Sequence, residues 1–94
     1  MLNIENYLAL VPRPVLDGLV AWAREARPPG GFLSAVIEDR LVESFALADE
    51  GNRAAMFYIA RFCYNEMPAE SRGPGALTTW PERLKQLADA GIVV

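Results

Sequence analysis

The sequence predicts an all-α fold, a compact bundle of four main helices with a possible short fifth helix at the N-terminus. Apolar residues recur at helical spacing in several segments, and Pro and Gly clusters separate those segments. Ninety-four residues suffice for one domain and are too few for two, so we expect residues 1–94 to form a single helical domain. Hydrophobic residues make up 52% of the chain, which predicts an unusually apolar core or an interface.

The N-terminal residues 3–11 allow two interpretations. In one, Asn3 caps a short helix that carries Tyr7, Leu8 and Val11; in the other, the same residues form an irregular arm. We favour the short helix.

The first clear helix is predicted over residues 14–26. Pro14 suits a first turn, where a missing N–H group costs nothing. The spacing i, i+3, i+4, i+7 is filled by Leu16, Leu19, Val20 and Ala23. Gly18 weakens such a helix by about 1 kcal/mol relative to Ala. Close packing against a neighbour is the reason we expect for it.

Two further helices are predicted between the Pro-Pro-Gly-Gly turn at residues 28–31 and the loop after Pro68. The second helix spans residues 32–48. The third spans residues 50–67, with Asp49 as its N-cap. From Met56 to Tyr64 the third helix carries only one charge, and a helix that is apolar nearly all round is buried on most sides. We expect it to be the central helix of the fold or one shared between protomers.

The last helix is predicted to begin near Thr79, after a loop over residues 69–78. Thr79 and Glu82 have the spacing of a capping box. Gly91 is the expected C-cap. Residues 92–94 form an apolar tail, which we expect to dock against the body of the protein or a partner.

Charge and composition disfavour several classes of function. The net charge is −3 and the nine Lys and Arg residues form no run, whereas nucleic-acid binders usually show a basic face. With one Cys and no His, the chain cannot form an internal disulfide, a Cys/His zinc site or a histidine-dependent triad. We therefore expect no catalytic residue, no metal, no cofactor and no enzymatic activity.

No segment reads as a signal peptide or a membrane span. The longest nearly apolar run, residues 54–64, is interrupted by Arg61 and is too short to cross a bilayer. We therefore expect a cytoplasmic protein that does not bind membranes.

Several conspicuous residues have plain structural interpretations. The acidic residues between Glu38 and Glu50 are expected to form a solvated surface. We expect Trp22 and Trp80 to lie in the core, and we do not expect Cys63 to be a nucleophile because no histidine can activate it.

The candidate binding residues lie on the third helix. Tyr58, Arg61 and Asn65 share one helical face through their i, i+3, i+7 spacing, and Tyr64 adds a second aromatic ring with a polar tip. Arg53, near the start of the helix, could grip an anion there or form an ion pair with its cap residue, the interpretation we favour.

Three segments together resemble a group of small helical proteins encoded in tailed-phage and prophage genomes. They are the PPGGFLSAVI of residues 28–37, the ADEGNRA of residues 48–54 and the YNEMP of residues 64–68. The resemblance implies a small accessory protein that acts in the host cytoplasm by binding a host or defence protein. It implies no catalytic residues.

Two hypotheses of function follow. In the first, a non-enzymatic interaction protein uses Tyr58, Arg61, Tyr64 and Asn65 as its contact face. In the second, a homo-oligomer sequesters a nucleotide signal: Arg53 and Arg61 hold the anion, and Tyr58 or Tyr64 stacks on the base. Whether the two arginines line a closed pocket or a flat surface distinguishes the hypotheses. Under both, we expect self-association.

Overall fold

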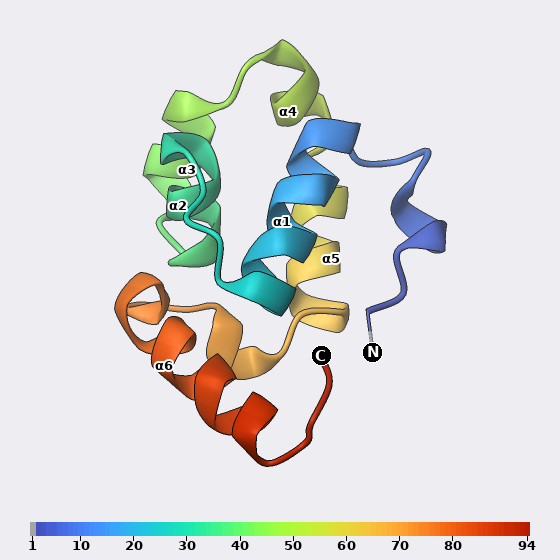
Figure 1. Cartoon of the computed structure of the whole chain (residues 1–94). Helices are drawn as coiled ribbons and strands as arrows, with labels where there is room; N and C mark the ends of the chain where they lie inside the picture. Colours follow the sequence, from blue (N-terminus) through green and yellow to red (C-terminus); the bar gives the residue numbers. More distant parts are fainter. Residues whose placement is uncertain (1) are drawn as a thin grey trace.

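The computed structural model describes residues 2–94, and every regular element in that range is helical (Figure 1). The elements are the 3-10 turns η1 (Glu5–Tyr7) and η2 (Ala69–Ser71) and the helices α1 (Arg13–Glu25), α2 (Gly31–Ile37), α3 (Leu41–Leu47), α4 (Glu50–Ala54), α5 (Met56–Asn65) and α6 (Ala76–Asp89). The all-α prediction is confirmed. The helices are shorter and more numerous than in the four-helix bundle we expected.

The first helix lies where the sequence predicts it, within one residue at each end. Its core face is Val15, Leu16, Leu19, Trp22 and Ala23. The side chain of Leu33 on α2 packs closely against Gly18: a Cβ at this position would lie 2.6 Å from Cδ1 of Leu33. The expectation of close packing at Gly18 is therefore confirmed.

Two tryptophans join α1 to α6 in the centre of the core, as predicted. Trp22 and Trp80 are 1% and 0% exposed. The indole N–H of Trp22 donates to the carbonyl of Ser71 (2.7 Å), and that of Trp80 donates to the carbonyl of Trp22 (3.1 Å). Because both indole donors are satisfied, the rings are buried at no polar cost.

The predicted helix over residues 32–48 is wrong as a single element, because a turn at Asp39 divides it into α2 and α3. Asp39 has a φ of 60°, the left-handed conformation that ends helices. The N–H of Arg40 donates to the carbonyl of Ala35 (2.9 Å), and that of Asp39 donates to the carbonyl of Val36 (3.2 Å). These two bonds form a Schellman motif, which reverses the chain and lays α3 against α2.

The predicted helix over residues 50–67 is also divided, and it ends two residues early. The break falls at Ala55, between α4 and α5, and α5 ends at Asn65. The cap at its start is confirmed: a side-chain oxygen of Asp49 accepts the N–H of Asn52 (2.7 Å). Only one side of α5 is buried, through Ile59, Phe62 and Cys63.

The capping box predicted at Thr79 is wrong, because α6 begins three residues earlier at Ala76. Gly75, at a φ of 85°, precedes the helix, and a carboxylate oxygen of Glu38 accepts the N–H of Leu77 (3.0 Å). A side chain distant in sequence thus accepts one of the free N–H groups in the first turn of α6. Gly91 ends α6 as predicted, with a φ of 77° and the next N–H bonded to the carbonyl of Leu87.

The N-terminal segment is an irregular arm that contains only the 3-10 turn η1. The side chain of Asn3 makes no cap; its backbone N–H instead donates to a carboxylate oxygen of Glu66 (2.9 Å). The ring of Tyr7 packs edge-on against Phe62, with centroids 5.0 Å apart. The short helix that we favoured there is therefore wrong, and the alternative, an irregular arm, is confirmed.

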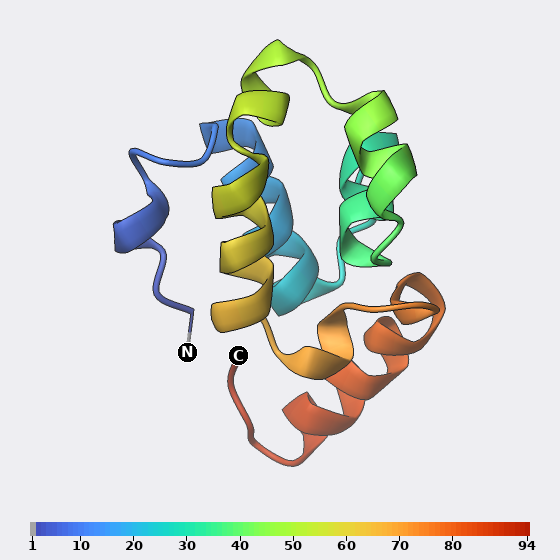
Figure 2. The same ribbon diagram turned by 180° about the vertical axis from the view of Figure 1, so that it is seen from behind.

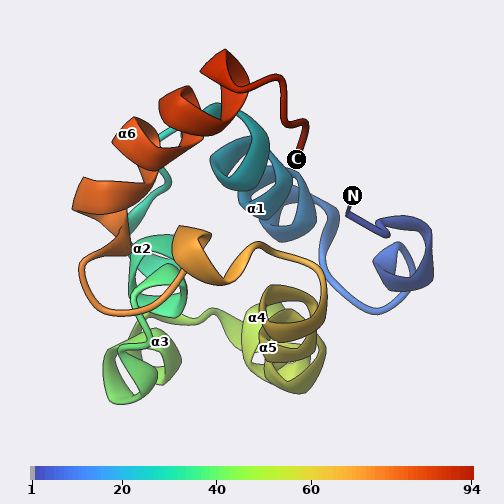
Figure 3. The same cartoon turned by 90° about the horizontal axis from the view of Figure 1, so that it is seen from below.

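The C-terminal tail folds back toward α1, and its end lies near the start of the N-terminal arm in Figures 1, 2 and 3. Val94 packs against the core, whereas Ile92 and Val93 are exposed. No helix in residues 2–94 is long and apolar enough to span a bilayer.

The helices form two unequal layers. Figure 2 shows α3 and α5 on the near face, with α2 and α1 behind them. Seen from below in Figure 3, α3 and α5 protrude side by side and are separated by a gap. This arrangement places two short helices at the edges of one face of the molecule.

Candidate functional site

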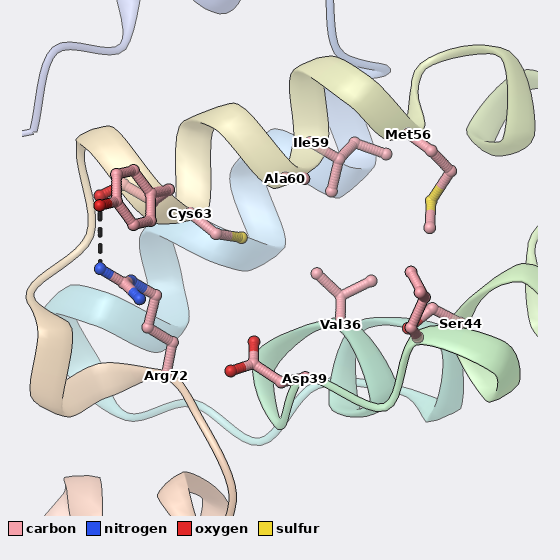
Figure 4. Close-up of a pocket in the computed structure, with 10 residues that line it drawn as sticks. Val36, Asp39, Ser44, Met56, Ile59, Ala60, Cys63 and Arg72 are labelled. Atoms are coloured by element: carbon pink, nitrogen blue, oxygen red, sulfur yellow. Dashed lines mark hydrogen bonds between the residues drawn. The ribbon is translucent and has the colours of Figure 1, made fainter.

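An open groove of about 450 Å³ lies between the α2–α3 pair and α5. Figure 4 shows its walls: α5 along one side, α2 and α3 along the other, and Arg72 at one end. Its lining is mostly apolar and consists of Val36, Asp39, Leu41, Ser44, Met56, Ile59, Ala60, Cys63, Tyr64 and Arg72. The volume is within the range of about 300–1,000 Å³ that is typical of binding sites.

The two helices that wall this groove, α3 and α5, expose large apolar side chains, of which Leu41 and Tyr64 line the groove itself. On α3, Leu41 is 67% exposed, Val42 83% and Phe45 46%. On α5, Phe57 is 67% exposed and Tyr64 74%. An exposed apolar patch of this kind on a small domain usually marks an interaction site.

The local sequence explains why α3 leaves its apolar residues in water. The helix has seven residues and packs chiefly against α2, so only one narrow side can be covered. The residue on that side is Ser44, whose hydroxyl donates to the carbonyl of Arg40 (2.7 Å). The four large apolar side chains of α3 remain 46–83% exposed.

One end of the groove is polar and carries an unpaired donor. The guanidinium of Arg72 lies over the ring of Tyr64, 5.2 Å from its centroid, and donates to the Tyr64 carbonyl (3.3 Å; Figure 4). Its Nε–H group is buried and has no hydrogen-bond partner among the described residues. Leaving such a donor unpaired costs about 1–3 kcal/mol, which an acceptor supplied by a ligand could recover.

The thiol of Cys63 faces the groove and is held in its neutral form (Figure 4). Burial raises the pKa of Cys63 to about 12. Desolvation is the largest cause. The nearby Arg72 charge lowers this pKa by a smaller amount, and the Asp39 charge raises it further. A thiol that stays protonated at neutral pH is a poor nucleophile and contributes to the groove as a small apolar surface.

The structure separates the five binding residues predicted from the sequence. Tyr64 lies on the rim of the groove. Tyr58 and Arg61 line a second pocket of about 200 Å³ together with Asn6, Tyr7 and Leu10 of the N-terminal arm. Arg53 on α4 and Asn65 at the end of α5 are exposed and line neither site.

Sequence reasoning missed most of the residues that form the groove. The exposed residues of α3 could have been predicted. Leu41, Val42 and Phe45 do not all lie on one narrow face of a helix, so a helix of two turns that packs on one side leaves some of them exposed. Arg72 gave no signal, because it lies in an irregular segment after η2 and is brought to Tyr64 only by the fold.

The acidic residues form no metal site within the described part of the chain. No group of three or more His, Cys, Asp or Glu side chains there is placed to hold a metal ion. Glu38 accepts the N–H of Leu77, and Glu43 pairs with Arg40 on the surface.

Comparison of the chain with protein families, with curated proteins and with solved structures finds no match.

Proposed function

We propose that this chain is a non-enzymatic protein-interaction module, and that its groove between α3 and α5 takes one amphipathic helix. The observation that carries the proposal is a mostly apolar groove of about 450 Å³ between two helices that both leave large apolar side chains exposed. Packing an apolar helix face between two helices is a recurrent mode of peptide recognition.

The length of the groove supports a helix of about two turns as its ligand. The α5 wall runs from Met56 to Tyr64, a distance of about 12 Å at about 1.5 Å per residue. A helix laid along it would place side chains spaced i, i+3 or i+4, and i+7 over the apolar floor formed by Val36 and Ile59.

The polar end of the groove supports an orientation. Arg72 offers a positive charge and the unpaired Nε–H donor, so the bound helix should place a carboxylate or its free C-terminal carbonyls at that end. Tyr64 is 74% exposed, and its side chain can move aside to uncover Nε. The resemblance to phage proteins leads us to propose a host or defence protein as the source of the helix.

The small-molecule hypothesis has weaker support. The pocket beside Tyr58 and Arg61 has about 200 Å³, below the range of about 300–1,000 Å³ typical of ligand sites. Arg53 does not line that pocket, so the pocket offers an anion only one of the two arginines.

A peptide-display selection with counter-selection tests the proposal. The library consists of bridged helical peptides, randomised on one face. Ala60→Trp serves as the counter-selection target, because Ala60 is an exposed lining residue and an indole there fills the groove. The matched control is Ala90→Trp, at an exposed position at the end of α6.

We expect enriched peptides to carry apolar residues at i, i+3 or i+4, and i+7. Their affinity should fall at least tenfold in Ala60→Trp and stay unchanged in Ala90→Trp. If the selection enriches no such peptides over the Ala60→Trp protein, the groove does not bind helices and the proposal is overturned.

A further inference from the structure

We infer that in the free protein the groove is occupied by α3 of a second copy of this chain, in a symmetric dimer. The inference rests on the proposed function, because it identifies the helix that the groove takes. A host helix would then have to compete with the second copy. Three independent features of α3 support the assignment.

The first feature is the fit of length and surface. α3 has seven residues, about 10 Å, and the groove accepts about two helical turns. Its outer row is Leu41, Val42 and Phe45, on a helix whose only buried residue is Ser44. Within this row, Leu41 and Phe45 have the i, i+4 spacing of two neighbouring side chains on one helix face. The same short helix is therefore both a wall of one groove and a suitable occupant of another.

The second feature is the area available. Five apolar side chains that α3 and α5 leave 46–83% exposed present roughly 600 Å² per copy, because a Phe or Tyr side chain covers about 150–250 Å² and a Leu or Val somewhat less. Together with the groove floor, this approaches the about 800 Å² per partner that a stable interface buries. Small monomeric domains rarely leave so large an apolar patch in water.

The third feature is electrostatic. In a two-fold dimer with paired antiparallel α3 helices, the incoming α3 runs parallel to α5, because α3 and α5 of one chain are antiparallel (Figure 2). Its C-terminal end then lies nearest Arg72. No backbone N–H outside the helix, within residues 2–94, donates to the carbonyls of the last turn of α3. These free acceptors complement the unpaired donor of Arg72.

Sedimentation velocity on the full chain tests the inference. Val42→Glu places a charge on the outer row of α3 at a position that is 83% exposed and contacts no groove of its own chain. The matched control is Val93→Glu, which changes the same residue type at 75% exposure on the tail. Both variants should fold, which thermal unfolding followed by circular dichroism verifies.

We expect the unchanged protein and Val93→Glu to be dimers at about 100 μM, and Val42→Glu to be a monomer whose dimer dissociation constant rises at least 100-fold. A monomeric unchanged protein overturns the inference. So does a dimer that survives Val42→Glu, or one that Val93→Glu dissociates equally well.

The failure of this inference and the failure of the proposed function give different results. Val42 does not line the groove, so monomeric Val42→Glu keeps an open groove for the displayed peptides. If the dimer is absent but peptides bind, only the second copy is wrong. If Val42→Glu binds no helical peptide, helix capture by the groove is wrong.

Discussion

Helices α1 and α3 are both rich in apolar residues but place them differently. α1 buries five side chains, among them Trp22, and indole hydrogen bonds join Trp22 to η2 and to α6. α3 buries only Ser44 and leaves Leu41, Val42 and Phe45 exposed. Hydrophobicity therefore stabilises the fold in one region and remains available for binding in the other. Each prediction below tests this division.

The largest effect is expected at the centre of the core. Trp22→Ala removes a fully buried ring and leaves the Ser71 carbonyl without its donor, which should lower the free energy of unfolding by about 3–5 kcal/mol. Phe57→Ala, at an exposed position on α5, should change this free energy by less than about 0.5 kcal/mol. Urea denaturation followed by circular dichroism measures both.

Trp22→Phe serves as a milder variant if the alanine protein does not fold. If the Trp22 and Phe57 variants lost comparable unfolding free energy, the exposed side of α5 would contribute to the core, and the division between core and binding surface would be wrong.

The next effect is the protection of Cys63. Its pKa rises from 9.0 to about 12 on folding, so the thiolate fraction at pH 8 falls about 1,000-fold. Alkylation by iodoacetamide should slow by at least that factor relative to the urea-unfolded chain. A native rate within tenfold of the unfolded rate would contradict the burial of the thiol beneath the groove.

The same shift predicts how stability depends on pH. The unfolded thiol loses its proton at a lower pH than the folded thiol, so the folded state holds more protons between pH 9 and 12. This contribution to stability is complete below pH 9 and is lost as the pH rises toward 12. Cys63→Ala should make the alkaline decrease in stability shallower, as measured by urea denaturation at each pH.

A matched pair of isosteric substitutions separates the two regions more finely. Val15→Thr buries a hydroxyl in the core face of α1 and should cost about 1–3 kcal/mol. Val42→Thr puts the same hydroxyl in water and should cost less than about 0.5 kcal/mol in dilute, monomeric protein. A loss above 1 kcal/mol for Val42→Thr would place that side chain in an intramolecular contact.

The sequence predicted the core region better than the groove. The heptad-like spacing of α1, the Asp49 cap and the Gly91 terminus are local patterns, and the structure confirms each of them. The division of residues 32–48 was missed, because a left-handed Asp39 has no local signal as clear as glycine.

The polar end of the groove and the start of α6 both depend on contacts between different segments of the chain. Arg72 reaches Tyr64 across a turn, and Glu38 completes the start of α6 from thirty-nine residues away. Spacing along one helix predicts which residues share a face, as for Tyr58 and Arg61. It cannot predict which neighbouring segment that face meets.

The smallest effect concerns the turn that creates the α3 wall. Asp39→Gly should raise the free energy of unfolding by about 0.5 kcal/mol, because glycine adopts a φ of 60° without the strain that an aspartate side chain brings. Glu43→Gly is the matched control. It places glycine in the helical interior of α3 and should lower stability by about 1 kcal/mol.

The opposite signs of these two changes, measured by thermal unfolding, would show that the break at Asp39 is set by backbone conformation rather than by its carboxylate. Asp39→Asn removes the charge and keeps a side chain that tolerates the left-handed region. It should therefore leave stability close to that of the unchanged protein. If Asp39→Asn instead destabilises the protein as much as Glu43→Gly does, the carboxylate holds the turn, and the position of α3 depends on the charges at the end of the groove.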